Sequence, residues 1–268
     1  MKRKTGLIKR FIQDFYLVII LVFLYAPIAT MMVLSFNSSK SRTQWGGFTL
    51  RWYQDLFASS TIMTALYNTL LIAFLSSLIA AVIGTAAAIA INSMNRGPRS
   101  LLMGITNIPM LNADIVTGIS LMLAFIAFRI SLGFQTILIS HITFNIPYVI
   151  LSVMPKLKQT DKSTYEAAMD LGATPVYAFF KVIFPDILPG VLSGFLLAFT
   201  MSLDDFIITH FTKGAGINTL STLIYSEVRR GIRPSMYALS TIIFIAVLVL
   251  LLLTNFAPKR KYNRRTTT

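Results

Sequence analysis

Three carboxylates lie within long apolar stretches of the sequence. Asp114 lies near the middle of one stretch, and Asp204 and Asp205 lie side by side toward the end of another. Ionisable side chains cost free energy in a bilayer, so they are usually retained for a function. Because almost no base accompanies these acids, they predict a path for a cation. The alternative is that they form hydrogen bonds between helices, or that one of them is protonated.

Asp204 and Asp205 cannot both face one cavity equally. Neighbouring side chains on a helix point about 100° apart. We therefore expect one of Asp204 and Asp205 to be structural, either capping a break in the helix or pairing with His210 or Lys213. Asp204 is the first candidate for the path, followed by Asp114 and Asp205.

Other chemistry is not indicated by the sequence. It has no G-x-x-x-x-G-K-[ST] loop, so the chain is not expected to bind and hydrolyse ATP in that way. His141 and His210 are isolated, and a lone histidine in an apolar helix is usually a hydrogen-bonded packing residue. No cysteine is present to form a thiolate metal site. The sequence predicts a protein that is not an enzyme and holds neither a cofactor nor a metal.

The elements that position these acids are membrane helices. The 268 residues are 55% hydrophobic and 13% charged, and six apolar runs are long enough to cross a hydrocarbon core of about 30 Å. The first run is too long for a signal peptide and has no cleavage site after it, so we expect it to be retained. The expected fold is an all-α integral membrane protein of one domain, residues 1–268. The six spans are 15–36, 63–93, 101–128, 133–154, 187–211 and 235–257.

The basic residues predict the orientation of these spans. With the N-terminus inside, 16 of the 24 lysines and arginines fall on the cytoplasmic side, which favours an N-in, C-in topology. The net charge of +14 is then mostly an orientation signal, and we do not expect nucleic acid binding. The segment 156–186 faces the cytoplasm in this topology.

A polar segment inside 156–186 predicts two short helices with a corner between them. Ser163 and Glu166 have the spacing of a capping box, and Gly172 can close the first helix in the left-handed conformation. Thr174-Pro175 is typical of a helix start, and Phe184-Pro185 of a helix end. Two short helices with a rigid corner, called the knob below, would give a partner protein a surface to bind. The alternative is an ordinary loop on the bilayer surface.

This segment resembles a known signature. Glu166-Ala167-Ala168, then Gly172, then Val182-x-Phe184-Pro185 is similar to the EAA-x3-G-x9-I-x-L-P loop of ABC importer permeases, with Val182 for Ile and Phe184 for Leu. In that family the loop forms helices that dock on a cytoplasmic ATPase. The resemblance implies that Glu166, Ala167, Ala168, Gly172 and Pro185 couple this chain to such an ATPase.

Further segments resemble the PotC-type permeases of spermidine/putrescine importers. These segments are Phe36–Ser39, Trp45–Thr49, Trp52-Tyr53, Asp114–Val116, Ser140–Phe144, Leu203–Asp205 and Ile224–Ser226. The resemblance implies a type I importer permease with the MetI-like fold, in the bacterial cytoplasmic membrane, that carries polyamines. Its implied partners are a second, homologous permease subunit, a cytoplasmic ATPase dimer that binds the ATP, and an extracytoplasmic polyamine-binding protein.

Site roles follow from this resemblance. Asp204, Asp114 and Asp205 would attract the ammonium groups of the substrate, and Trp45 would offer them an aromatic face. Trp52, Tyr53, Arg229 and Arg230 would dock the binding protein. The alternative for the three aromatic residues is that they anchor the chain at the membrane interface.

Three other functions are compatible with the sequence. One is an ABC permease for another solute, such as ferric iron. Another is an ion-coupled secondary transporter that uses the intramembrane aspartates, although it has no need of a cytoplasmic knob. The third is a structural membrane scaffold, which does not explain why the intramembrane acids are present.

Overall fold

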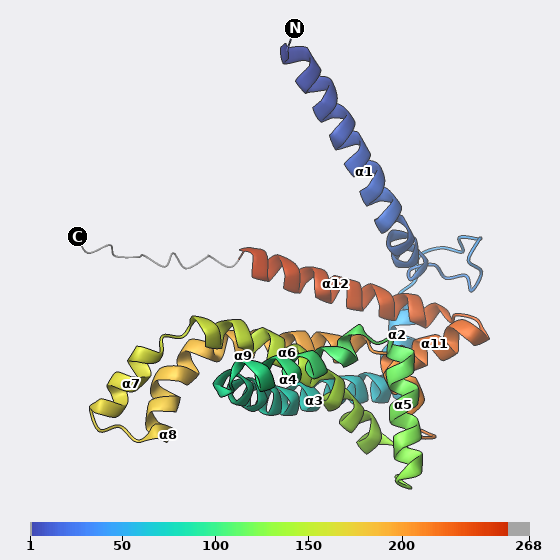
Figure 1. The fold of residues 1–268 in the computed structure, drawn as a ribbon. Coiled ribbons are helices and arrows are strands. Elements are labelled where there is room, and N and C mark those ends of the chain that lie inside the picture. Colours follow the sequence, from blue (N-terminus) through green and yellow to red (C-terminus); the bar gives the residue numbers. More distant parts are fainter. Residues whose placement is uncertain (1, 257–268) are drawn as a thin grey trace. The chain divides into compact units, whose positions relative to one another are not determined.

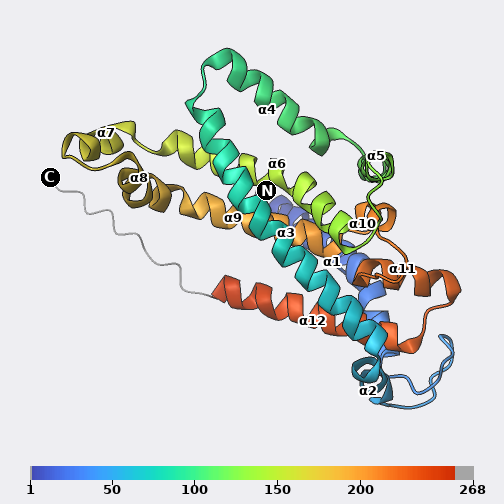
Figure 2. The same ribbon diagram turned by 90° about the horizontal axis from the view of Figure 1, so that it is seen from below.

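The structure is a computed structural model that describes residues 2–256 (Figures 1 and 2). Within those residues the chain is helical, apart from turns, loops and one isolated β-bridge between Asn37 and Phe48. It divides into two compact units. Thr61–Ser226 forms one unit, and the described residues on either side of it form the other. That the whole chain is a single domain stays a prediction.

The helices follow one another closely along the chain. In order they are α1 (Lys2–Leu34), α2 (Arg51–Ala58), α3 (Ser60–Ser93), α4 (Arg96–Leu111), α5 (Asp114–Ala127), α6 (Phe134–Gln159), α7 (Lys162–Asp170), α8 (Pro175–Ala178), the π-helical turn η1 (Phe179–Ile183), α9 (Phe184–Asp204), α10 (Ile207–Thr212), α11 (Leu220–Arg230) and α12 (Pro234–Phe256).

Four helical runs within the described residues are long and apolar enough to cross a membrane. They are Phe15–Leu34, Ser60–Ser93, Phe134–Gln159 and Pro175–Asp204, which correspond to predicted spans one, two, four and five. The sixth predicted span falls on α12, a helix of 23 residues. The all-α membrane fold is confirmed, whereas the count of six spans stays a prediction.

The third predicted span is bent rather than straight. Helices α4 and α5 meet at 102°, and they are separated by Asn112 and Ala113 in extended conformation. Pro109 lies one turn before the break and lacks the amide that a helix needs there. Asp114 begins α5, where a carboxylate interacts favourably with the helix dipole. Asp114 therefore lies at a helix start, next to the bend of the predicted span.

The fifth predicted span differs at both ends. Pro185 does not end a helix, because the chain stays helical from Pro175 to Asp204. The π-helical turn η1 precedes Phe184, whose amide donates to the carbonyl of Phe179, five residues earlier. This wider turn accommodates Pro185, which has no amide to donate. At the other end α9 stops at Asp204, and α10 is a separate helix.

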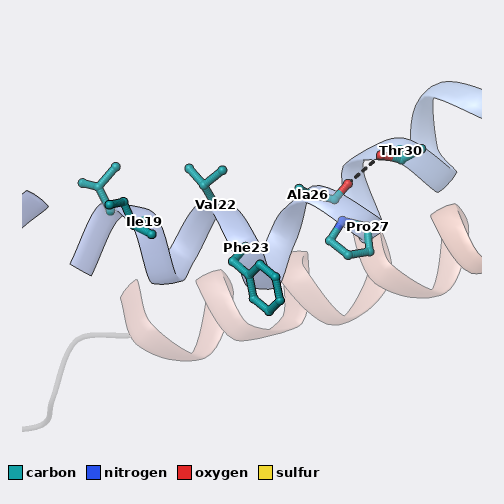
Figure 3. A pocket seen from close by; sticks show the side chains of 7 residues that line it. Ile19, Val22, Phe23, Ala26, Pro27 and Thr30 are labelled. Atoms are coloured by element: carbon teal, nitrogen blue, oxygen red, sulfur yellow. Dashed lines mark hydrogen bonds between the residues drawn. The ribbon is translucent and has the colours of Figure 1, made fainter. Parts of the chain in front are cut away.

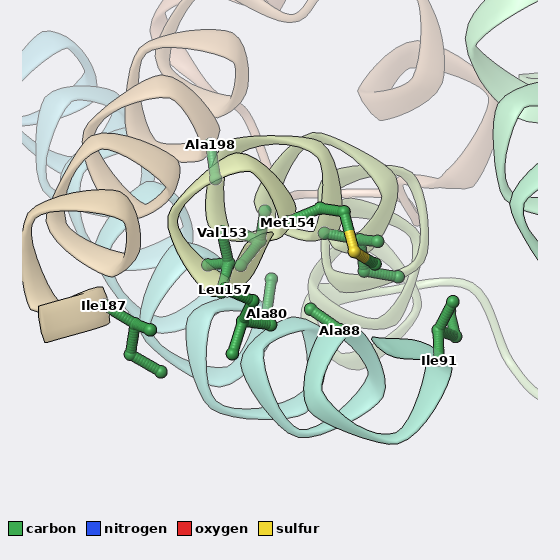
Figure 4. Close-up of a cluster of buried hydrophobic side chains, with 10 residues drawn as sticks. Ala80, Ala88, Ile91, Val153, Met154, Leu157, Ile187 and Ala198 are labelled. Atoms are coloured by element: carbon green, nitrogen blue, oxygen red, sulfur yellow. The ribbon is translucent and has the colours of Figure 1, made fainter. Parts of the chain in front are cut away.

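Small residues let α3, α6 and α9 pack closely in the unit Thr61–Ser226. A Cβ added at Gly84 would lie 2.8 Å from Cβ of Val149, and one at Gly190 would lie 2.9 Å from Cγ of Lys156. Gly194, Ala198 and Ser202 continue the buried stripe on α9. Close backbone approach is the main source of helix association in lipid. The apolar side chains buried between these three helices form the core of the unit (Figure 4).

A second close approach fixes the segment after α10. Gly214 lies against the loop before α6, and a Cβ added to it would lie 2.0 Å from the carbonyl oxygen of Leu132. The hydroxyl of Thr136 donates to the carbonyl of Thr212 at 2.7 Å, so the two chain segments are also hydrogen bonded. No side-chain rotation can relieve a clash with a backbone oxygen.

We therefore expect Gly214→Ala to lower the stability of the protein by more than about 3 kcal/mol, because overpacking here displaces backbone. Thermal unfolding in detergent measures the change. Gly104→Ala is the control, since an added Cβ at Gly104 meets nothing within 4 Å. Equal melting temperatures for the two variants would contradict the prediction.

The other unit contains α1, α2 and α12. The side chain of Asn37 organises the loop after α1: its Nδ2 donates to the carbonyl of Gln44 at 2.8 Å, and its Oδ1 accepts the amides of Ser39 and Gly46. Around Pro27, α1 carries a shallow apolar hollow, where Thr30 Oγ1 donates to the carbonyl of Ala26 at 2.8 Å (Figure 3). Apolar side chains on this surface suit contact with lipid or another apolar helix.

Candidate functional site

A hollow of about 440 Å³ in the unit Thr61–Ser226 collects the predicted acids. The break between α4 and α5 and the end of α9 both open onto it. Its lining residues are Pro109, Asp114, Thr117, Phe144, Tyr148, Met201, Asp204, Asp205, Phe206, Ile207 and Ile208. The structure therefore brings together all three aspartates that the sequence analysis selected.

Asp114 and Asp204 present their carboxylates to this hollow. Both side chains are exposed, and neither forms an ion pair or a side-chain hydrogen bond with any described residue. Asp114 is the first residue of α5 and Asp204 is the last of α9, so each lies where a helix is interrupted. Two unpaired negative charges in one hollow form a site that favours a cation.

Asp205 has a different role in the structure. Its Oδ2 accepts the amide of Thr209 at 2.7 Å and the hydroxyl of Thr209 at 2.8 Å, and its Oδ1 accepts the amide of Ile208. It thus caps the break after α9, which confirms that one member of the adjacent pair is structural. Of the two structural roles predicted for it, capping is the one observed, and its basic partner is His141 at 3.4 Å and not His210 or Lys213. Lys213 instead donates to Oδ1 of Asn218.

Two aromatic residues in the hollow were not selected from the sequence. Phe144 and Tyr148 are one turn apart on α6 and line the hollow with the two free carboxylates. Their four-residue spacing, which places both on one helix face, was the available signal. An aromatic face next to carboxylates offers a cation a second kind of contact.

The predicted knob consists of α7 and α8, which lie together at one end of the unit, beyond α6 and α9 (Figures 1 and 2). Gly172 has φ +88°, and its amide donates to the carbonyl of Met169 while that of Ala173 donates to Ala168. These two bonds are the Schellman closure of a helix. Thr174 caps α8, and Pro175 occupies its first turn. The predicted corner at Gly172 is confirmed.

The start of α7 differs from the prediction. The N-cap is Asp161 and not Ser163, because Oδ1 of Asp161 accepts the amide of Ser163 at 3.0 Å. This bond lowers the pKa of Asp161, since it favours the charged carboxylate. Ser163 thus lies inside the first turn, and the predicted capping box with Glu166 is wrong. The side chain of Glu166 is exposed.

The corner between α7 and α8 leaves an open hollow of about 540 Å³. It is lined by Ala168, Leu171, Gly172, Ala173, Thr174 and Tyr177. Leu171 is 89% exposed and Tyr177 is 58% exposed, so the knob carries apolar side chains on its surface. Ala167 is also exposed, and Pro185 lies farther along, just after the π-helical turn. Exposed apolar groups gathered around one hollow are a common feature of contact surfaces.

The residues predicted to act on the outer side of the membrane form two groups, one held by hydrogen bonds within the chain and one exposed. The indole of Trp52 is buried and donates to the carbonyl of Asn37, and the hydroxyl of Tyr53 is hydrogen bonded to Ser35. These two side chains hold the loop in place. In contrast, Trp45 is 58% exposed, and Arg229 and Arg230 at the end of α11 are exposed.

The helical membrane fold, the hollow and the knob are features expected of a membrane transport subunit. Residues 80–262 match the family described as binding-protein-dependent transport system inner membrane component, and the chain belongs to this family. It is therefore a multi-pass component of an ABC import system of the inner membrane.

Individual relatives are similar over most of their length. The putrescine transport system permease protein PotI of Escherichia coli is 40% identical over 233 residues, which cover 84% of this chain and 83% of that protein. The spermidine/putrescine transport system permease protein PotC of Haemophilus influenzae is 35% identical over 250 residues, which cover 93% of this chain and 97% of the relative.

Solved structures support the fold. A chain of a bacterial ABC transporter involved in the import of the acidic polysaccharide alginate has a TM-score of 0.64 at 20% identity, and the match covers 93% of this chain and 97% of that one. A chain of the MetNI methionine ABC transporter in an inward-facing conformation has a TM-score of 0.59 at 18% identity, with coverage of 73% and 95%. The predicted type I importer permease fold is confirmed.

Proposed function

We propose that this chain is the permease subunit of an ATP-driven importer for polyamines and that it forms half of the translocation path. The observation that carries the proposal is the hollow with the free carboxylates of Asp114 and Asp204 beside Phe144 and Tyr148. The relatives PotI and PotC are named as permeases of putrescine and spermidine/putrescine transport systems, and these names support the same substrate class.

The chemistry of the hollow suits a flexible polycation. A polyamine has ammonium groups separated by methylene segments, so it needs spaced anionic groups with apolar surface between them. Asp114 and Asp204 come from separate helices, and aromatic rings and Met201 lie in the same lining. Weak binding at more than one point permits passage, since a transported cation must also leave. Trp45 is the outer aromatic residue of the proposed path.

Coupling to ATP is assigned to the knob. In this proposal Glu166, Ala167, Ala168, Gly172 and Pro185 belong to the surface that docks on a dimer of cytoplasmic ATPase subunits. The exposed Leu171 and Tyr177 support this assignment. The ATP is bound by the ATPase, so this chain needs no cofactor of its own. ATP acts by binding one conformation of the complex better than the other.

The remaining partners complete the transporter. A second, homologous permease subunit forms the other half of the path, with both chains oriented N-in and C-in in the lipid membrane. Arg229 and Arg230 are assigned to dock an acidic patch on an extracytoplasmic polyamine-binding protein, and Trp52 and Tyr53 support the loop on that side. Nucleic acid is not among the partners.

Uptake by the complete transporter tests the proposal. Proteoliposomes that hold the assembled complex, with the binding protein outside and ATP inside, should accumulate radiolabelled putrescine or spermidine. Unlabelled polyamines should compete, whereas ferric iron should not. Accumulation driven by an ion gradient without ATP would favour a secondary transporter, and competition by iron alone would replace the substrate class.

A further inference from the structure

The imidazole of His141 connects both sides of the break at the end of α9. His141 lies on α6 and is 1% exposed. Its Nδ1 is hydrogen bonded to Oγ of Ser202 on α9, and its Nε2 lies 2.9 Å from Oγ1 of Thr209 on α10. A single ring on a third helix therefore holds the two helices that Asp205 and Phe206 separate.

The order of donors in this network is determined by Asp205. Its carboxylate accepts the hydroxyl proton of Thr209, so the oxygen of Thr209 is free to accept the N–H of His141 Nε2. Nδ1 is then the acceptor, and the hydroxyl of Ser202 donates to it. Ser202 is also 3.1 Å from the hydroxyl of Ser76 on α3. Each ring nitrogen and each hydroxyl of this network thus has a partner, and satisfied buried networks are rigid.

The network also fixes the backbone at Asp205. The carbonyl of Asp205 accepts the hydroxyl of Ser221 at 2.7 Å, and the amide of Leu220 donates to Thr69 on α3. Asp204 is the preceding residue, and its own carboxylate has no partner among the described residues. Because the backbone at Asp205 is fixed, the position of the Asp204 carboxylate in the hollow is fixed as well.

We propose that His141 is a positioning residue of the cation path. Through Thr209 and Asp205 it fixes the break after α9 and thereby the location of Asp204 in the hollow, without contacting the cation itself. The importance of Asp204 for uptake rests on the proposed function, whereas its location does not.

The absence of cysteine from the sequence makes this location measurable. Asp204→Cys and, separately, Asp114→Cys each give this chain a single thiol in the same hollow. The rate of modification by a positively charged methanethiosulfonate is then followed on this chain in the assembled transporter. With His141→Leu, we expect the rate at position 204 to change by about tenfold and the rate at position 114 to stay within about twofold.

Four variants distinguish positioning from general damage. His141→Gln retains an N–H donor, so the modification rate at position 204 should return close to its value in the protein with His141. Thr209→Val should reproduce the effect of His141→Leu, and the double variant should add nothing further, because both break one network. Thr143→Val is the matched control, since among the described residues the hydroxyl of Thr143 bonds only to the carbonyl of Ile139 in its own helix.

An unchanged rate at position 204 in both His141→Leu and Thr209→Val would overturn the proposal. So would equal changes at positions 204 and 114, which would indicate general loosening of the unit. If His141→Leu fails to assemble, Thr209→Val carries the same comparison. The labelling result does not depend on which solute is carried, so it can fail or succeed separately from the polyamine assignment.

Discussion

Asp204→Asn is expected to reduce polyamine uptake by about tenfold, which corresponds to about 1.4 kcal/mol of lost stabilisation of the cation. The carboxylate lies in the hollow without an ion pair or side-chain hydrogen bond to the described residues, so its charge is available to a passing ammonium group. Removing it takes no partner away from any other side chain. Initial rates of uptake into proteoliposomes, at saturating binding protein, measure the effect.

Two comparisons make the result specific to charge in the hollow. Asp204→Glu keeps the charge and should retain most of the uptake. Asp186→Asn removes an exposed acid from the first turn of the same helix, α9, at the opposite end, and should have little effect. The amount of assembled complex should be equal in all three variants. Unchanged uptake by Asp204→Asn would remove this residue from the path.

Gly172→Val is expected to separate ATP hydrolysis from transport. The corner between α7 and α8 requires φ +88° at this position, where a β-branched residue costs about 1–3 kcal/mol. The knob should therefore change shape, so that the ATPase continues to turn over while uptake falls by about tenfold or more. An added Cβ meets nothing within 4 Å, so a steric clash is not the cause. Parallel assays of phosphate release and uptake give the ratio of the two.

The matched control lies at the same position. Asparagine tolerates the left-handed conformation better than other non-glycine residues, so Gly172→Asn should keep the corner and most of the coupling. Normal coupled uptake by Gly172→Val would contradict the coupling role of this corner. Loss of the protein from the membrane in both variants would indicate a folding requirement instead.

The sequence predicts those features that depend on local chemistry. Long apolar runs identify spans because a bilayer leaves few alternatives, and Gly172 identifies the corner because few other residues adopt its conformation. The four-residue spacing of Gly190, Gly194 and Ala198 is likewise a local pattern, and the structure buries all three on α9. Each of these features can be inferred from a short segment of chain.

Features that depend on distant partners, or on a choice between equally good local signals, could not be predicted. The ends of α9 and α10 are fixed by Asp205 together with His141, which is remote in sequence. Asp161 and Ser163 are both good capping residues two positions apart, and only the local geometry decides between them. Pro185 normally signals the end of a helix, but a π-helical turn accommodates it. The roles of the site residues stay predictions.

The π-helical turn has a mechanical consequence. Because it keeps the chain helical past Pro185, Pro175–Asp204 is one run of 30 residues, which spans about 45 Å at the usual rise. One end carries Tyr177 of the knob, and the other carries Asp204 of the hollow. In the proposed transporter, a displacement at the knob would reach the hollow along one continuous helix, without crossing a loop. The same continuity would let an occupied hollow change the position of the knob.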